Sequence, residues 1–250
     1  MSASLMAHMI AGYPDYDTSL ETARALAAGG ASLLEIQFPF SDPSADGPAI
    51  QAACTLALTA GFKVADGWRL VETVRNEFPA IPVFVMSYAS IVVTKGVDAF
   101  VAQAKKSGAV GLIIPDLAPG ADEGLYDAGA KHGVVVVPVI VPSVPSARLE
   151  RILASKPEWV YTAIRAGITG THTTLTPALK EFLAKLNART KVMAGFGIDS
   201  PEQVRDLESS THTVVVGSAL VRAVAAAAQS GGKVAVRREL EARVRQLVSA

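Results

Sequence analysis

The stretch that decides the fold is residues 33–51, which read L-L-E-I-Q-F-P-F-S-D-P-S-A-D-G-P-A-I-Q. An apolar run carries one carboxylate, Glu35, in its middle and then breaks into a loop that holds prolines, a glycine and two more carboxylates, Asp42 and Asp46. The pattern predicts that a helix begins at Pro48. A charge inside a packed strand costs free energy unless it is paired or used. Glu35 is therefore the residue that the rest of the chain has to explain.

The composition is that of a globular protein with a large core. Half of the 250 residues are hydrophobic and 18% are charged, a poor fit to a disordered chain. Lysines plus arginines balance acids at 23 each, so the charge does not indicate nucleic acid or a membrane as partner. The single cysteine, Cys54, excludes an intramolecular disulfide and is predicted to be a buried core residue. No apolar run reaches the roughly 18 residues of a membrane span, so a cytoplasmic protein is the default expectation.

Short apolar runs alternate with helical stretches along the whole chain. The predicted strands are residues 5–11, 32–38, 82–88, 111–116, 134–141, 159–164, 191–195 and 213–216. The predicted helices are residues 17–28, 48–59, 65–77, 97–106, 122–132, 146–155, 177–186 and 201–207, with a final region in two pieces, 219–228 and 234–248. This alternation predicts an α/β fold with a parallel sheet. Eight strand–helix units favour a single domain, residues 1–250, folded as a closed (β/α)8 TIM barrel of eight parallel strands over an open doubly wound sheet.

The site of such a barrel is built at the carboxyl ends of the strands. Because side chains alternate along a strand, Glu35 and Gln37 share one face, and this polar face is predicted to line the barrel interior. A carboxyl group in that confined space is usable as both proton donor and acceptor. The alternative, a structural carboxylate paired with a buried donor, stays open at this point.

Two further polar residues are weaker candidates. Asp46 lies in a loop whose prolines limit its freedom, and a loop acid of this kind is by itself typical of a solvated residue or a cap. Tyr161 lies inside the sixth predicted strand, and its hydroxyl needs a partner if it is buried. Core packing and a place in the lining of the site are equally compatible with Tyr161.

Glycines gather where three successive strands end, in the segments 165–170 (R-A-G-I-T-G), 195–197 (G-F-G) and 217–218 (G-S). Glycine lets backbone N–H groups approach an anion, and a helix N-terminus favours negative charge. The three segments together predict a substrate that carries a phosphate. The four histidines are scattered without metal-ligand spacing, so no metal site is assigned, and the chain has no G-x-x-x-x-G-K-[ST] loop for a nucleotide.

These residues resemble a known family, the α subunit of tryptophan synthase, over nearly the whole chain. The most specific motif is L-E-I-Q-F-P-F-S-D-P-S-A-D-G-P-A-I-Q, which is similar to the family's L-E-x-G-x-P-F-S-D-P-x-A-D-G-P-x-I-Q. Supporting matches are residues 11–15 (A-G-Y-P-D), 114–117 (I-P-D-L), 165–170 (R-A-G-I-T-G), 195–198 (G-F-G-I) and 216–219 (V-G-S-A).

The resemblance implies a lyase that cleaves indole-3-glycerol phosphate to indole and glyceraldehyde 3-phosphate by a retro-aldol reaction. In that family the glutamate that matches Glu35 protonates the indole ring carbon, and the aspartate that matches Asp46 accepts the indole N–H. Tyr161 falls at the family's tyrosine near the glutamate. The positions that match the residues holding the substrate phosphate are Gly170, Phe196, Gly197, Gly217 and Ser218.

The resemblance also implies partners. The loops 39–47 and 165–177 correspond to lids that close over the substrate and touch the β subunit, in a heterotetramer of two α and two β subunits. No cofactor belongs to the α subunit, because the pyridoxal phosphate of tryptophan synthase is on the β subunit, which receives the indole.

Three residues depart from the family pattern. Gln37 stands where glycine is usual, Ser90 where asparagine is usual and Ile164 where serine is usual. Gln37 is expected to bond Glu35, to shift its pKa or to fill space that the indole ring needs. Two alternatives to an active lyase therefore stay open, a weakly active allosteric partner of a β subunit and a related phosphate-binding barrel that releases free indole.

Overall fold

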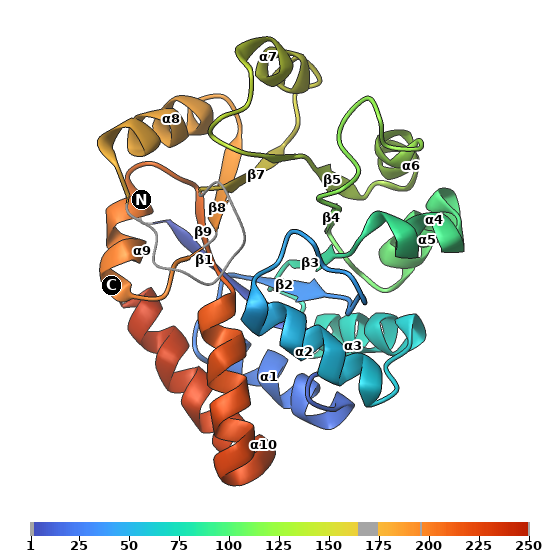
Figure 1. Ribbon diagram of the computed structural model, residues 1–250, viewed down its shortest axis with the longest axis vertical. Helices are drawn as coiled ribbons and strands as arrows, with labels where there is room; N and C mark the ends of the chain where they lie inside the picture. The colour runs from blue at the N-terminus through green and yellow to red at the C-terminus, as the bar shows by residue number, and fades with distance from the viewer. Residues whose placement is uncertain (1–2, 165–174, 196, 250) are drawn as a thin grey trace.

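The computed structural model describes residues 3–164, 175–195 and 197–249. Its strands form one parallel sheet in the order β5-β4-β3-β2-β1-β9-β8-β7-β6, which curls into a barrel (Figure 1). The strands are β1 Ser4–Ile10, β2 Leu33–Gln37, β3 Val83–Met86, β4 Gly111–Ile113, β5 Val135–Val137, β6 Val139–Ile140, β7 Trp159–Ala163, β8 Lys191–Gly195 and β9 Thr213–Val216. The barrel predicted from the sequence is confirmed.

The structure differs from the prediction in the number of strands, which is nine in the described residues because the fifth predicted strand is divided at Pro138. Proline has no N–H to donate to a ladder. On one side of Pro138, β5 pairs with β4, and on the other side β6 pairs with β7 through Val139 and Tyr161. The carbonyl of Pro138 itself accepts the N–H of Tyr161 at 2.9 Å. The two ends of the sheet are thus two halves of one extended segment.

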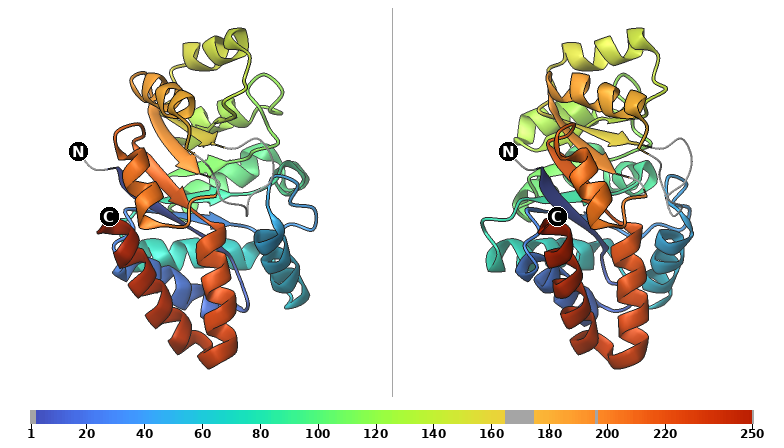
Figure 2. Two further views of the ribbon diagram at one scale, coloured as in Figure 1. Left: turned by 60° about the vertical axis from the view of Figure 1, so that its left-hand side comes forward. Right: turned by 90° about the vertical axis from the view of Figure 1, so that its left-hand side faces the viewer.

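Helices surround the barrel, as the three ribbon views show (Figures 1 and 2). They are α1 Tyr16–Ala28, α2 Pro48–Thr59, α3 Val64–Glu77, α4 Ala89–Lys95, α5 Val97–Lys106, α6 Leu125–His132, α7 Ser146–Ala154, α8 Pro177–Asn187, α9 Pro201–Glu208 and α10 Ser218–Val248. Backbone angles at Gly231 and Gly232 are not helical, so α10 consists of two arms, as predicted. Its arms form a hairpin that packs against α1 (Figure 2).

Helix α4 is a short element that the sequence pattern missed. Its N-terminal N–H, at Ala89, donates to both carboxylate oxygens of Asp116 at 2.9 and 3.1 Å. Asp116 lies after β4, so the group that caps this helix comes from a different strand. A signal of this kind is not visible in the local sequence.

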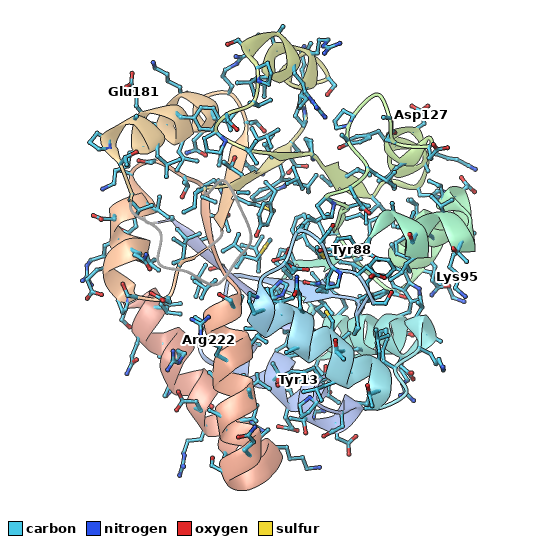
Figure 3. The ribbon with its side chains drawn as sticks, viewed as in Figure 1. Tyr13, Tyr88, Lys95, Asp127, Glu181 and Arg222 are labelled. Atoms are coloured by element: carbon cyan, nitrogen blue, oxygen red, sulfur yellow. The ribbon has the colours of Figure 1, made fainter. Side chains whose placement is uncertain are left out.

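Apolar side chains form two layers. One layer fills the space between the strands and the surrounding helices, and the other fills the barrel interior. The interior layer consists of Met6, Leu33, Phe84, Met86, Tyr88, Ile113, Val137, Trp159, Tyr161, Met193 and Val215. Tyr88 lies toward the centre in Figure 3, whereas the labelled charged residues Lys95, Asp127 and Glu181 lie on the surrounding helices. The interior is therefore a packed core, and in barrels of this kind the site lies at one end of such a core.

Among the described helices, none is by itself both long and apolar enough to cross a membrane. Helices α2 and α3 pass that test only as a pair joined at a bend of 107°.

Among the glycines near the site, Gly195 leaves the least room for a side chain. A Cβ atom there would lie 2.5 Å from the hydroxyl oxygen of Tyr161 and 3.1 Å from Cβ of Val215. We expect Gly195→Ala to lower the free energy of unfolding by about 1–3 kcal/mol, measured by chemical denaturation, because an overpacked core must shift.

The matched control for Gly195→Ala is a double variant. Tyr161→Phe removes the oxygen that the new methyl group meets, so Gly195→Ala with Tyr161→Phe should be less destabilised than the sum of the single variants. Simple additivity of the two changes would show that the contact with the hydroxyl does not limit this position.

Candidate active site

The inner face of β2 carries the polar residues around which the site is built. Glu35 is 3% exposed and Gln37 is fully buried, and both line the cavity at the carboxyl end of the barrel. The direction predicted for these two side chains from alternation along the strand is therefore correct. Below them on the same face, Leu33 belongs to the apolar layer, so the polar groups begin where the packed interior ends.

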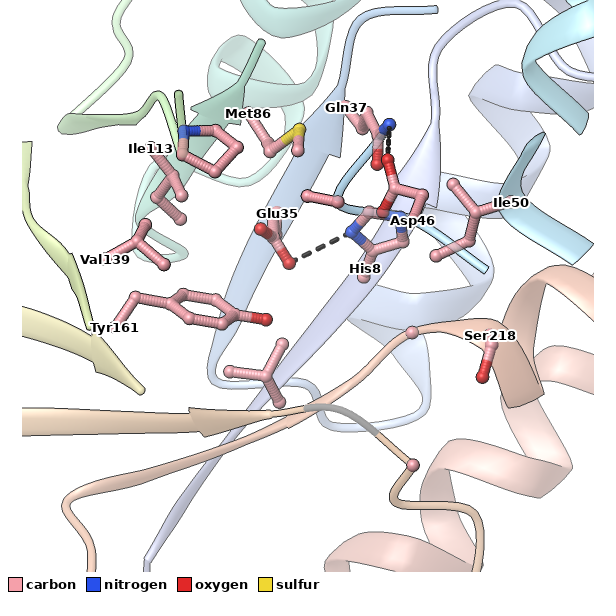
Figure 4. A pocket seen from close by; sticks show the side chains of 15 residues that line it. His8, Glu35, Gln37, Asp46, Ile50, Met86, Ile113, Val139, Tyr161 and Ser218 are labelled. Carbon is pink, nitrogen blue, oxygen red and sulfur yellow. Dashed lines mark hydrogen bonds and ion pairs between the residues drawn. The ribbon is translucent and has the colours of Figure 1, made fainter. Parts of the chain in front are cut away.

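A histidine on the neighbouring strand is the partner of Glu35. Nδ1 of His8 lies 3.0 Å from Oε2 of Glu35, and both side chains are buried (Figure 4). Burial lowers the pKa of His8, but the charge of Glu35, the hydrogen bond to it and the charge of Asp46 outweigh this effect, so the pKa lies above its ordinary value of 6.5. From the sequence, His8 was considered only as a metal ligand, and its place in the site was missed. The sequence shows His8 as a polar residue within an apolar predicted strand, but it does not show which residue of the next strand lies beside it.

Asp46 is the second carboxylate of the site. Its side chain is 4% exposed, so the interpretation of Asp46 as a solvated loop acid is wrong. Its Oδ2 accepts hydrogen bonds from Nε2 of Gln37 and from the hydroxyl of Tyr88, each at 2.7 Å. Burial raises the pKa of Asp46, and although the bonds from Tyr88 and Gln37 and the charge of His8 oppose this, the net shift is upward.

Gln37 connects this loop to the helix that follows it. The amide bonds Asp46 rather than Glu35, so among the roles expected for Gln37 the bond to the glutamate is wrong. Its Nε2 also lies 3.7 Å from the sulfur of Cys54 in α2. Cys54 is fully buried, as predicted, and burial raises the pKa of its thiol to about 12. Gln37 thus holds the loop carboxylate over the barrel.

Tyr161 enters the cavity from β7, on the opposite side from β1 and β2 (Figure 4). Burial, followed by the charges of Glu35 and Asp46, raises the pKa of Tyr161 well above its ordinary value of 10.0, so the hydroxyl stays neutral. Of the two roles that the sequence left open for Tyr161, the structure places it in the lining of the cavity as well as in the interior apolar layer.

The cavity encloses about 560 Å³ of empty space, part of it open to solvent. Its described lining consists of His8, Glu35, Gln37, Ala45, Asp46, Ile50, Met86, Ile113, Pro115, Val139, Tyr161, Gly197, Val215, Gly217 and Ser218. Most of these side chains are apolar, and His8 is the one basic side chain in this described set. A flat aromatic ligand suits such walls, since pockets of this kind combine apolar lining with a few polar groups.

Two of the predicted phosphate-binding segments reach this cavity. Gly197 has a φ of 81°, a conformation that favours glycine, and Gly217 immediately precedes α10, whose first residue is Ser218. The first N–H groups of a helix have no partner within it and attract anions. The other predicted positions, Gly170 and Phe196, lie outside the described residues.

Comparison with known proteins shows the family of the chain. Residues 1–249 match the family described as tryptophan synthase alpha chain. The chain belongs to this family. The alpha chain of Helicobacter hepaticus is 41% identical over 226 residues, which cover 87% of this chain and 84% of that protein. The alpha chain of Opitutus terrae is 38% identical over 224 residues, which cover 89% of this chain and 84% of that protein.

Solved structures of the family have the same fold. One describes the mutual activation of the tryptophan synthase a2b2 complex of Pyrococcus furiosus, with a TM-score of 0.88, 30% identity and coverage of 100% of this chain and 99% of that chain. Mycobacterium tuberculosis tryptophan synthase aligns with a TM-score of 0.84 and 32% identity, over 98% of this chain and 93% of that chain.

The two other departures from the family pattern lie away from the centre of the site. Ile164 is buried in the apolar layer between strands and helices, and its N–H donates to the carbonyl of Gly195 at 3.0 Å. Ser90 is exposed in the first turn of α4. Gln37 is therefore the departure with a direct effect on a carboxylate of the site.

The hydrogen bond between His8 and Glu35 leads to a prediction about pH. Glu35→Gln removes the charge that raises the pKa of His8 and leaves the burial that lowers it, so the pKa of His8 should fall below about 6.5, the ordinary value. Nuclear magnetic resonance titration of the imidazole measures it. In the wild type, where the folded pKa is raised, the pair stabilises the fold below about pH 6.5, and this contribution is lost as pH rises through the folded pKa.

Asp46→Asn is the control for this titration, because the charge of Asp46 is a smaller cause of the shift. It should lower the pKa of His8 by less than Glu35→Gln does. An unchanged pKa in Glu35→Gln would contradict the assignment of the pair.

Proposed function

We propose that this chain cleaves indole-3-glycerol phosphate to indole and D-glyceraldehyde 3-phosphate, as the α subunit of tryptophan synthase in tryptophan biosynthesis. The observation that carries the assignment of residues is the cavity itself, which places the buried carboxylates of Glu35 and Asp46 across from Tyr161 and beside the N-terminus of α10. Membership of the family supports the reaction.

In the proposed mechanism Glu35 gives a proton to the ring carbon that carries the glycerol chain, and Asp46 accepts the indole N–H. The ring becomes cationic when its carbon is protonated, and the charge of Asp46 stabilises it. The carbon–carbon bond then breaks, its electron pair returns to the ring, and the hydroxyl proton of the glycerol chain passes to Glu35. The products are neutral indole and an aldehyde, and Glu35 regains the proton that it gave.

The apolar lining has a role in this reaction. Side chains such as Ile113, Val139 and Val215 give apolar walls to the cavity that the two carboxylates line. Electrostatic interactions are stronger in a site of low dielectric, so Asp46 stabilises the cationic ring more than a solvated carboxylate would. The neutral hydroxyl of Tyr161 faces the same space and adds a polar group without adding charge.

We assign the substrate phosphate to Gly197, Gly217 and Ser218, with Gly170 and Phe196 as the remaining members of the proposed set. The described lining holds no lysine or arginine at this end, so backbone N–H groups and the dipole of α10 supply the attraction.

The proposed partner is a tryptophan synthase β subunit in a heterotetramer, with loop 39–47 at the contact. The similar Pyrococcus furiosus protein forms an a2b2 complex of this kind. We expect no cofactor on this chain, with pyridoxal phosphate confined to the β subunit, and neither nucleic acid nor membrane as partner. Within the described residues, His, Cys, Asp and Glu side chains form no group of three that could hold a metal ion. We place the enzyme in the cytoplasm.

Assay of indole release from indole-3-glycerol phosphate tests the proposed function. We expect the wild type to release indole, Glu35→Gln to lower kcat about 100-fold or more, and Asp46→Asn to lower it by a smaller factor, because general acid catalysis contributes about 100- to 10,000-fold. Asp42→Asn, an exposed residue of the same loop, is the matched control and should leave kcat of the isolated chain unchanged. No indole release with or without a β subunit would contradict the proposal.

A further inference from the structure

The partner of Glu35 is fixed by the register of two neighbouring strands. In the pairing of β1 with β2, His8 lies directly beside Glu35. Neighbouring residues of parallel strands point to the same side of a sheet, so both side chains face the barrel interior. His8 is 5% exposed and Glu35 is 3% exposed, and both line the substrate cavity.

The two nitrogens of His8 have different surroundings. Nδ1 lies 3.0 Å from Oε2 of Glu35, whereas Nε2 is buried and has no hydrogen-bond partner among the described residues. This arrangement favours the tautomer in which Nδ1 carries the hydrogen and donates it to the carboxylate. Gly217 faces the ring from the side of α10, and a Cβ atom at this position would lie at an ordinary contact distance of 3.5 Å from Cγ of His8.

A structural role alone is a poor explanation for this pair. Burying two ionisable groups costs free energy that their attraction recovers only in part, and apolar residues of similar volume often pack as well or better. The neighbours of His8 on the inner face, such as Met6 and Leu33, are apolar. His8 and Glu35 lie where the packed interior gives way to the cavity. The proposed reaction needs a proton in this cavity.

We propose that His8 is the positioning residue of Glu35. His8 fixes the carboxylate by its hydrogen bond to Oε2, and the two side chains share the proton that the indole ring carbon of the substrate receives. This inference rests on the proposed function. Because His8 holds Oε2, the other carboxylate oxygen of Glu35 is turned toward the indole ring of the substrate. The pair, rather than the glutamate alone, then acts as the general acid.

The proton balance of the pair is closed over one turnover. A C–H bond forms at the ring carbon while the O–H bond of Glu35 breaks, and the carboxylate left behind accepts the Nδ1–H of His8. When the carbon–carbon bond breaks, the hydroxyl proton of the substrate goes to Glu35 and the pair has its original number of protons again. The proton can rest on either member of the pair, because Nδ1 of His8 and Oε2 of Glu35 lie within hydrogen-bond distance.

Other titratable groups face His8 as well. Asp46 approaches from the loop after β2, and its charge acts on His8 in the same direction as that of Glu35. Tyr161 on β7 and Tyr88 after β3 lie next to the two carboxylates, but both have a raised pKa and stay neutral. Glu35 is therefore the acidic group that His8 contacts directly.

Steady-state kinetics of indole release across pH 5.5–9.5 tests the inference. His8→Phe fills the space but donates no hydrogen bond, so kcat should fall about 10-fold or more with KM nearly unchanged. His8→Asn keeps a donor near the position of Nδ1 but cannot hold a proton. The His8→Asn enzyme should recover part of kcat at its pH optimum. The loss of activity on the alkaline side of its pH profile should occur about one pH unit lower than in the wild type.

Met6→Leu is the matched control, because Met6 lies on the same face of β1, two residues before His8, in the apolar layer. It should keep both kcat and the pH profile. A His8→Phe or His8→Asn enzyme with the kcat and pH profile of the wild type would overturn the role of His8 while leaving the proposed function intact. A wild type that releases no indole would overturn both. If His8→Phe does not fold, the pH profile of His8→Asn decides alone.

Discussion

A carboxylate buried in the interior of a barrel has to be held by neighbouring polar groups, and the site is arranged around this requirement. Glu35 has His8 at 3.0 Å, and Asp46 has Gln37 and Tyr88 at 2.7 Å each. Without these groups the two acids would be buried without partners, at a cost of several kcal/mol. The same groups fix the direction in which each carboxylate faces the cavity. Stability and catalytic geometry therefore depend on the same hydrogen bonds.

The parallel strands determine where this polar cluster lies. All of them run in one direction, so their carboxyl ends meet at one end of the barrel, and aromatic side chains such as Phe84 and Trp159 fill the interior below. Polar residues placed any deeper would displace this packing. Gln37 takes part in the arrangement by bonding Asp46, and it leaves Glu35 to His8. The departure of Gln37 from the family pattern thus acts on the aspartate side of the site.

Much of this was predictable from the sequence, and the exceptions have physical causes. Alternation along a strand gave the direction of Glu35, and strand–helix alternation gave the barrel. His8 was missed because pairing between strands depends on register, which local patterns do not contain. Asp46 was misread because its burial depends on Tyr88, 42 residues away in sequence. Helix α4 was missed because Asp116 caps it from another loop.

The central claim is that Glu35 delivers the proton to the ring carbon of indole. Hydrogen exchange at this carbon tests it most directly. Wild-type enzyme in deuterium oxide, supplied with indole and glyceraldehyde 3-phosphate, should replace the hydrogen at this carbon with deuterium faster than buffer alone does. Glu35→Gln should not exceed the rate of the buffer, because the ring then lacks the acid that protonates it. Equal exchange by the wild type and by Glu35→Gln would contradict the claim.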